Sequence, residues 1–134
     1  MARREPFPGK YLRAIELEAE ASVIEEYASA TVPGLLQTRD VATFSLHAGH
    51  PHTSPIELKQ MIDARMKRQE SMCGAKPPRW AFILDEAVLR RPVGSPAVMA
   101  AQLGSIIRRS SESSYITVQV LRIGRVSTRR WVGR

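Results

Sequence analysis

Three histidines and one cysteine are the side chains of this sequence that could most directly hold a metal ion. His47, His50 and His52 lie close together, and Cys73 is the only thiol. Zinc prefers four nitrogen or sulfur ligands at defined spacings, but these histidines fall across a predicted helix end and a proline-containing loop. A nucleophilic thiol would need a base beside it. We therefore expect no metal and no other cofactor, and a partly buried, inert Cys73.

Two acidic residues follow the most apolar run of the chain. Asp85 and Glu86 come directly after residues 80–84, and the carboxyl end of a buried strand is a favoured position for functional carboxylates. Neighbouring residues of a strand point to opposite sides, which makes a poor acid–base pair. The structural interpretation is that these carboxylates cap the following turn or bind Arg90 and Arg91. We prefer it, and a small enzyme that uses Asp85 or Glu86 is an alternative.

Basic groups on a predicted helix offer a third kind of site. Arg65 and Arg68 are three residues apart and share one helix face, with Lys67 and Gln69 beside them. They could bind phosphate, or they could form a solvated face or pair with carboxylates. The sequence shows no glycine-rich phosphate loop and no serine-hydrolase or zinc-protease motif. A helix-turn-helix is not evident either, because the segments around residues 32–34 carry apolar and acidic residues where base-reading residues would stand.

The positive charge is concentrated at the C-terminal end. The net charge is +7, from 20 basic and 13 acidic residues. Residues 122–134 contain no acidic residue and five arginines, Arg122, Arg125, Arg129, Arg130 and Arg134. The rest of the chain is almost neutral and offers no broad phosphate-binding face. A weak, salt-sensitive and non-specific nucleic-acid binder that uses these arginines is therefore one alternative function.

Helix-forming patterns dominate the first half of the chain. Residues 1–10 read as a flexible arm, and residues 11–30 are rich in helix formers. A second helix is expected from about residue 34 to 48. A third starts with a Ser54–Glu57 capping box, has Pro55 in its first position and should end near residues 73–74.

The second half predicts two strands that flank a helix. Residues 80–84 form a short apolar run, and residues 115–121 alternate β-branched with polar residues. Residues 85–91 read as a short helix or turn. A longer helix begins at Ser95, ends before a loop at 110–114 and has a core-facing stripe made of Met99, Leu103, Ile106 and Ile107.

The predicted fold class is α+β, with three to four helices packed on a small and incomplete β-sheet. The strand–helix–strand order suggests a βαβ-like unit with both strands in one sheet. Two strands are too few for a stable open sheet, so either a further strand is hidden in the sequence or a partner completes the sheet. No apolar run could span a bilayer, no signal-peptide core is evident, and one cysteine fits a reducing compartment, so we expect a cytoplasmic protein.

Four stretches in a fixed order resemble a known family. They are Val32-Pro33-Gly34-Leu35-Leu36-Gln37-Thr38, Arg65 with Arg68-Gln69, Leu84-Asp85-Glu86 running to Leu89-Arg90-Arg91-Pro92-Val93-Gly94, and Val118-Gln119-Val120-Leu121. Together they are similar to a domain of unknown function that follows the Xre-type helix-turn-helix in actinobacterial, Streptomyces-like transcription regulators. The similarity covers roughly residues 11–121, which we expect to form a single regulatory domain.

The resemblance implies a non-enzymatic domain that senses a ligand, dimerises or binds a small partner protein or a full-length relative. No catalytic residue carries over. The motif positions are the candidates for a ligand or partner site, namely Gln37, Arg65, Arg68, Gln69, Asp85, Glu86, Arg90 and Arg91. Sequence-specific DNA binding is not expected, because the helix-turn-helix of the family does not precede Tyr11. The ending after Leu121 departs from the family and looks truncated or frameshifted, and we expect residues 122–134 to be disordered.

Overall fold

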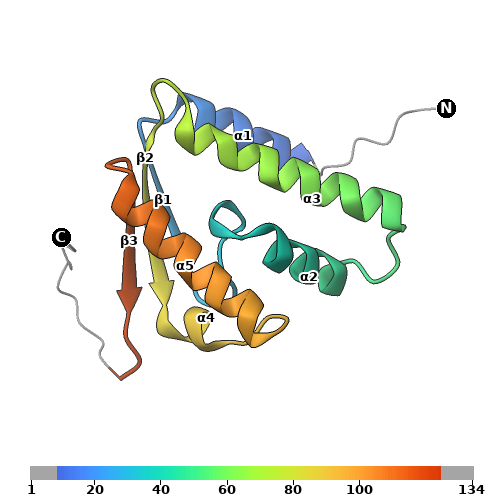
Figure 1. Ribbon diagram of the computed structural model, residues 1–134. Coiled ribbons are helices and arrows are strands. Elements are labelled where there is room, and N and C mark those ends of the chain that lie inside the picture. Colours follow the sequence, from blue (N-terminus) through green and yellow to red (C-terminus); the bar gives the residue numbers. More distant parts are fainter. Residues whose placement is uncertain (1–8, 125–134) are drawn as a thin grey trace.

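The computed structural model describes residues 9–124, and the expectations for residues 1–8 and 125–134 lie outside that range (Figure 1). Between Gly9 and Gly124 the chain forms five α-helices, two short 3₁₀ helices and three strands. In chain order they are α1 (Gly9–Glu20), β1 (Val23–Ala28), η1 (Gly34–Leu36), α2 (Arg39–Gly49), α3 (Pro55–Gln69), η2 (Glu70–Cys73), β2 (Arg79–Asp85), α4 (Glu86–Arg90), α5 (Pro96–Glu112) and β3 (Ile116–Leu121).

The α+β class is confirmed, and the sheet has one more strand than the sequence predicted. The strand order is β1-β2-β3 and both pairs are parallel. The parallel β2 and β3, connected through α4 and α5, confirm the expected βαβ-like unit. The described chain has five helices instead of three to four, because residues 86–90 are a helix of their own.

The helix predicted over residues 11–30 is wrong in its second half. The chain leaves the helix after Glu20 and continues as β1 with the sequence VIEEYA. Its burial alternates residue by residue, which is the period of a strand. Glutamate and alanine favour helices in isolation, and pairing with β2 overrides that preference.

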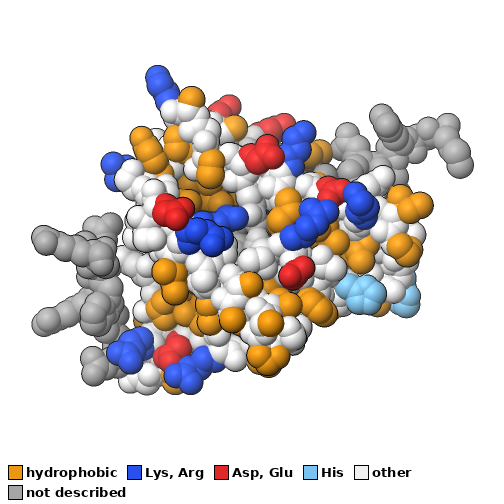
Figure 2. All heavy atoms as spheres, viewed as in Figure 1, with side chains coloured by type: hydrophobic (Ala, Val, Ile, Leu, Met, Phe, Trp, Pro, Cys, Tyr) orange, Lys and Arg blue, Asp and Glu red, His pale blue; other side chains and the backbone are white. Residues whose placement is uncertain are grey.

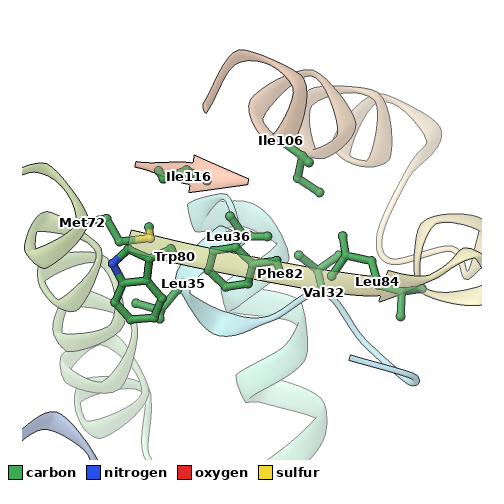
Figure 3. Packing of buried hydrophobic residues seen from close by; sticks show 10 residues of the cluster. Val32, Leu35, Leu36, Met72, Trp80, Phe82, Leu84, Ile106 and Ile116 are labelled. Carbon is green, nitrogen blue, oxygen red and sulfur yellow. The ribbon is translucent and has the colours of Figure 1, made fainter. Parts of the chain in front are cut away.

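One face of the sheet carries the core. The register aligns Ile24 with Trp80 and Ile116, and every second residue from there points to the same side. On β2 this side holds the buried residues Trp80, Phe82 and Leu84, and the rings of Trp80 and Phe82 stack 5.8 Å apart. Figure 3 shows them against side chains from the segment after β1, from α5 and from β3.

The helices gather on this same side. Leu35 and Leu36 of η1, Met72 of η2, Val88 of α4 and Ile106 of α5 belong to the core cluster with the β2 side chains. In Figure 1, α5 runs along the front of the sheet, while α1 and α3 lie next to each other at one end. The Arg68–Glu18 ion pair joins these two helices.

Helix starts were predicted well, and helix faces less so. Ser54 and Glu57 form the expected capping box with Pro55 in the first turn, and Ser95 caps α5. The stripe predicted for α5 is wrong at Ile107, which is 67% exposed. The buried face of α5 instead holds Gln102, Ser105 and Ile106, and the helix continues to Glu112, through most of the expected loop.

The helix expected over residues 34–48 is also divided. Gly34–Leu36 is a single 3₁₀ turn, and α2 begins at Arg39 after the N-cap Thr38, whose hydroxyl accepts from the Val41 amide. No helix within residues 9–124 is long and apolar enough to cross a membrane.

Candidate functional site

The segment from Val32 to Thr38 is buried, and side chains bind its backbone carbonyls. Gln37 Nε2 donates to Val32 O at 2.9 Å. Gln69 Nε2, from the end of α3, donates to Gly34 O at 2.8 Å and to Gln37 O at 2.7 Å. Gln37 and Gln69 were both predicted as site residues, and both are buried. Their observed role is to fix this segment, since an unpaired buried carbonyl is costly.

Two residues of α5 complete this network, and the sequence analysis missed both. Gln102 Nε2 donates to Leu36 O at 2.8 Å, and Gln102 Oε1 accepts from the Thr38 amide at 2.8 Å. Arg109 donates to Leu35 O at 2.8 Å and to Gln69 Oε1 at 2.6 Å. Burial lowers the pKa of the Arg109 guanidinium. A glutamine on an otherwise apolar helix face was the available signal for such a contact.

Arg65 of α3 lies on the outer side of the same segment. Its Nη1 donates to Gln37 Oε1 at 2.9 Å. A Cβ added at Gly34 would come within 3.4 Å of Arg65 Nε, so glycine at this position lets the guanidinium approach the backbone closely. The predicted residues Gln37, Arg65 and Gln69 are therefore brought together by the fold.

An open cavity of about 760 Å³ lies beside Arg65, at the carboxyl end of β1. Its walls come from the end of β1 and the following loop, from η1, α2 and α3, and from the loop after α4. Side chains with distinct chemistry line it, namely Glu26, Gln37, Phe44, Ser45, Arg65 and Val93. Polar and apolar groups line it in similar proportion, and its volume lies within the range of small-molecule sites.

Glu26 is the ionisable residue on the inward side of β1. It aligns with Phe82 and Val118 in the sheet register, on the core side. Burial raises the pKa of its carboxyl group, the nearby Arg68 counteracts this, and Glu18 reinforces it. Arg68 holds Glu18 through two hydrogen bonds, from Nε to Oε2 at 3.1 Å and from Nη2 to Oε1. Arg68 therefore pairs with Glu18 and also attracts the Glu26 carboxylate.

Phe44 forms an aromatic wall of the cavity. Phe44 is 49% exposed. Gly94, which has a positive φ of 66°, packs against the ring, and a Cβ added there would lie 2.7 Å from Phe44 Cε2. Glycine is required at this position by the backbone and by the ring.

The acidic pair after β2 has structural partners. Asp85 Oδ1 accepts from the Ala87 amide and caps α4. Glu86 binds Arg90 within one helical turn and accepts from the Ile123 amide at 2.7 Å. These two bonds, the Ile123 amide first, lower the pKa of Glu86. The structural interpretation of Asp85 and Glu86 fits these contacts.

The other predicted residues do not join the cavity. Arg90, Glu86 and Arg122 line a separate hollow below β3. Arg91 reaches back to Ala30 O at 2.5 Å and ties the loop after α4 to the loop after β1. Arg68 binds Glu18. The eight candidate residues therefore fall into four places, and Arg125, Arg129, Arg130 and Arg134 lie outside the described residues.

The opposite face of the sheet forms a second surface of interest, which we call the open face. Its side chains include Val23 and Tyr27 of β1, Ala81 and Ile83 of β2, and Leu121 of β3, by the strand register. Val23 is 54% exposed, Tyr27 58% and Ile83 39%. Parallel sheets are usually covered on both faces, so apolar groups exposed here are a candidate interface.

The histidines and the cysteine occupy exposed positions. Cys73 is exposed at the end of η2, so the expectation that it is partly buried is wrong. Because η2 ends the α3–η2 segment at the surface, its last side chain points to solvent. Within the part of the chain that the structure describes, no group of three His, Cys, Asp or Glu residues is placed to hold a metal ion.

Comparison with known proteins identifies a family. No curated protein and no solved structure matches this chain. Residues 11–130 match the model of a domain of unknown function, DUF5753. That range includes the buried segment with its glutamines and arginines, the cavity and all three strands. The match spans most of the sequence, and the chain therefore belongs to the DUF5753 family.

Proposed function

We propose that this chain is a non-enzymatic regulatory domain of an Xre-family transcription regulator, which acts in the cytoplasm by binding a partner protein through its open face. The observation that carries the proposal is the three-stranded parallel sheet with one buried and one exposed face. Burying apolar surface drives most protein association. A partner that covers this face would give the sheet the two-sided packing that parallel sheets normally have.

The composition of the open face supports a protein partner over a nucleic acid. Val23, Tyr27 and Ile83 are apolar or aromatic and exposed, and Tyr27 and Ile83 are direct partners across β1 and β2. Glu25 adds a negative charge on this face and Arg79, which aligns with Val23, adds a positive one, so these two charges balance and give phosphate groups no net attraction. Aromatic and aliphatic groups mixed with a few polar and charged ones are common in protein interfaces.

The contacts of the acidic residues argue against the enzyme alternative. Asp85 caps a helix, and Glu86 is held by Arg90 and a backbone amide. A general base needs a substrate proton within hydrogen-bond reach, while these carboxylates already accept bonds that stabilise α4 and the end of β3. A regulatory domain does not need a catalytic group at this position.

The proposed partner is a small protein encoded beside this chain or a full-length relative with its own DNA-binding helices, and a homodimer is the third form of the same interaction. The test mixes the purified chain with each of the two proteins and measures mass by light scattering during size-exclusion chromatography and affinity by calorimetry. Val23→Lys and Ile83→Thr alter the open face. Ile56→Lys, at an exposed position of α3, is the matched control.

We expect one of these complexes, or a dimer, to form and to weaken at least about tenfold on either open-face substitution, because a central contact of an interface contributes about 1.4 kcal/mol or more. Ile56→Lys should bind like the unmodified chain. Thermal unfolding of each variant confirms that it is folded. A chain that stays monomeric and binds neither protein would refute the proposal, as would complexes that both open-face variants form with full affinity.

A further inference from the structure

The cavity at the carboxyl end of β1 combines three chemical features within one concave surface. Its lining includes an acidic residue, Glu26, a basic residue, Arg65, and an aromatic residue, Phe44, and Glu26 lies on the core side of β1. They belong to a strand and two different helices, β1, α3 and α2, so the fold and not the chain sequence brings them together. The open face used by the proposed function lies on the other side of the sheet, since Glu25 and Glu26 point in opposite directions.

Burying Glu26 costs free energy when no ligand is bound. Burial disfavours the charged carboxylate, as its raised pKa indicates. The cation that lowers the pKa of Glu26, Arg68, is bound through two hydrogen bonds to Glu18. A cationic group in the cavity would compensate the Glu26 charge directly, because a charge taken out of water is stabilised by a partner of opposite sign.

Arg65 places a positive charge in the same cavity. Its Nη1–Gln37 Oε1 bond and its contact with Gly34 fix the guanidinium at the wall. A simple amine would be attracted by Glu26 but repelled by Arg65. A simple carboxylate would be attracted by Arg65 but repelled by Glu26. A molecule that carries both an amino group and a carboxylate can complement both residues.

The other residues that line the cavity indicate the chemistry of the rest of the ligand. Phe44, Ala48, Val32 and Val93 are apolar, and the Phe44 ring is held by Gly94 while half of it stays exposed. Aromatic rings stack on apolar planar groups with ring centroids about 4.5–7 Å apart. The cavity volume of about 760 Å³ lies within the range of small-molecule sites.

From these features we propose that the cavity binds a small zwitterion, an amino acid with an apolar and preferably aromatic side chain, with its amino group at Glu26, its carboxylate on the Arg65 side and its side chain against Phe44. In a regulatory domain such a site would sense the amino acid. Binding itself does not depend on the partner interaction, because the two surfaces lie on opposite sides of the sheet and are tested with different substitutions.

The experiment uses the full chain without any partner and three probes that share one phenyl ring. L-Phenylalanine carries both charged groups, 3-phenylpropionate lacks the amino group, and phenethylamine lacks the carboxylate. Binding is followed by backbone amide NMR shifts and by calorimetry. We expect saturable binding of phenylalanine with a Kd of about 1 mM, as the size of the probe suggests, and shifts at the amides of residues 28–34.

Two variants connect the binding to the named residues. Glu26→Gln should weaken phenylalanine at least about fivefold and should remove its advantage over 3-phenylpropionate. Glu25→Gln, one residue away on the exposed side, is the matched control and should bind all three probes as the unmodified chain does. Phe44→Leu should keep the preference for the zwitterion but lower the affinity for phenylalanine relative to leucine, and it tests the site even if Glu26→Gln is poorly folded.

Several results would overturn the inference. One is an affinity for 3-phenylpropionate or phenethylamine equal to that for phenylalanine. Another is a Glu26→Gln protein, folded by its amide spectrum, that retains the preference for phenylalanine over 3-phenylpropionate. The absence of any saturable shift at 20-fold the expected Kd, about 20 mM, would do the same. Loss of partner binding with intact phenylalanine binding would count against the proposed function alone.

Discussion

At the scale of single residues, amide and guanidinium side chains determine the conformation of the segment between β1 and α2. Residues 32–37 are nearly all buried, yet they form only one turn of 3₁₀ helix. Their carbonyls therefore cannot be satisfied by regular secondary structure. Gln37, Gln69, Gln102 and Arg109 supply those bonds. The motif residues Gln37 and Gln69 therefore have a structural role that does not depend on a ligand.

Replacing Gln102 tests this explanation. Gln102→Leu keeps the volume but removes the bonds to Leu36 O and from the Thr38 amide. Each buried group left without a partner costs about 1–3 kcal/mol, so we expect a loss of about 2–4 kcal/mol in the free energy of unfolding. Urea denaturation measures it. Gln60→Ala, on the exposed side of α3, is the control and should change stability by less than about 0.5 kcal/mol; equal effects of the two would contradict the role of Gln102.

Glu26 gives a prediction for the dependence of stability on pH. Burial raises the pKa of Glu26 in the native state above its ordinary value of 4.5. At a pH between the ordinary and the raised pKa, the native protein therefore binds more protons than the unfolded chain. The free energy of unfolding then falls as the pH rises through this interval. Glu26→Gln lacks this effect, so its stability relative to the unmodified chain should be greater at pH 7 than at pH 4, by less than about 1 kcal/mol since part of the group meets solvent.

The measurement is urea denaturation of both proteins at the two pH values. Glu25→Gln, on the exposed side of the same strand, should show no such increase. A relative stability of Glu26→Gln that falls from pH 4 to pH 7 would contradict the prediction, because it would mean that the attraction of Arg68 outweighs the effect of burial on the Glu26 carboxyl group.

At the scale of elements, the sequence predicted those whose local signals agree with their packing. The capping box of α3 and the cap of α5 satisfy backbone groups locally, and β2 and β3 combine β-branched and apolar residues. The prediction missed β1 because the local preference of this segment is helical, and only the pairing of Val23–Ala28 with β2 makes it a strand. The prediction that Ile107 faces the core was wrong because a stripe of several apolar residues on a helix does not determine which edge of the stripe is buried.

The candidate site was predictable only in part for a related reason. Gln37, Arg65 and Gln69 were found as motif residues and do meet in space. Glu26 and Phe44, which give the cavity its chemistry, lay in segments that read as ordinary amphipathic helix. Their role depends on β1 being a strand and on Gly94 packing against the Phe44 ring, which are both consequences of contacts between distant parts of the chain.

The Ser54 cap provides a prediction for α3, the helix that carries Arg65 and Gln69. Ser54 accepts from the Glu57 amide, and Glu57 binds back to Ser54. Ser54→Ala should lower the free energy of unfolding by about 1 kcal/mol, measured by urea denaturation. Ser111→Ala, near the end of α5 and exposed, should be neutral or slightly stabilising, because alanine is the better helix former. A Ser54→Ala protein as stable as the parent would show that the cap contributes little to this helix.

At the scale of the whole molecule, the sheet separates two surfaces with different chemistry. The core side carries the cavity with Glu26 and Arg65 next to the helices, and Figure 2 shows charged side chains of both signs among hydrophobic ones on that side. The open face combines the exposed Val23, Tyr27 and Ile83 with the charged Glu25 and Arg79. β1 contributes to both surfaces, and Tyr27 of the open face also lines the cavity, so a ligand that shifts this edge strand could alter the partner surface. That connection gives a regulatory domain a short physical path between sensing and binding.

The distribution of charge over the molecule gives a last prediction, for the nucleic-acid alternative. Up to residue 121 the basic and acidic residues nearly balance, and five arginines follow. Such a segment can neutralise at most about five phosphates, so the slope of log K against log salt for random duplex DNA should be no steeper than about −4.5. We expect weak binding at 50 mM salt that disappears by 200 mM and does not depend on sequence, measured by fluorescence anisotropy. Replacing Arg125, Arg129, Arg130 and Arg134 with serine should abolish it; DNA binding that persists in this variant at 150 mM salt would instead place the contact on the folded body, where the near balance of charges gives no reason to expect it.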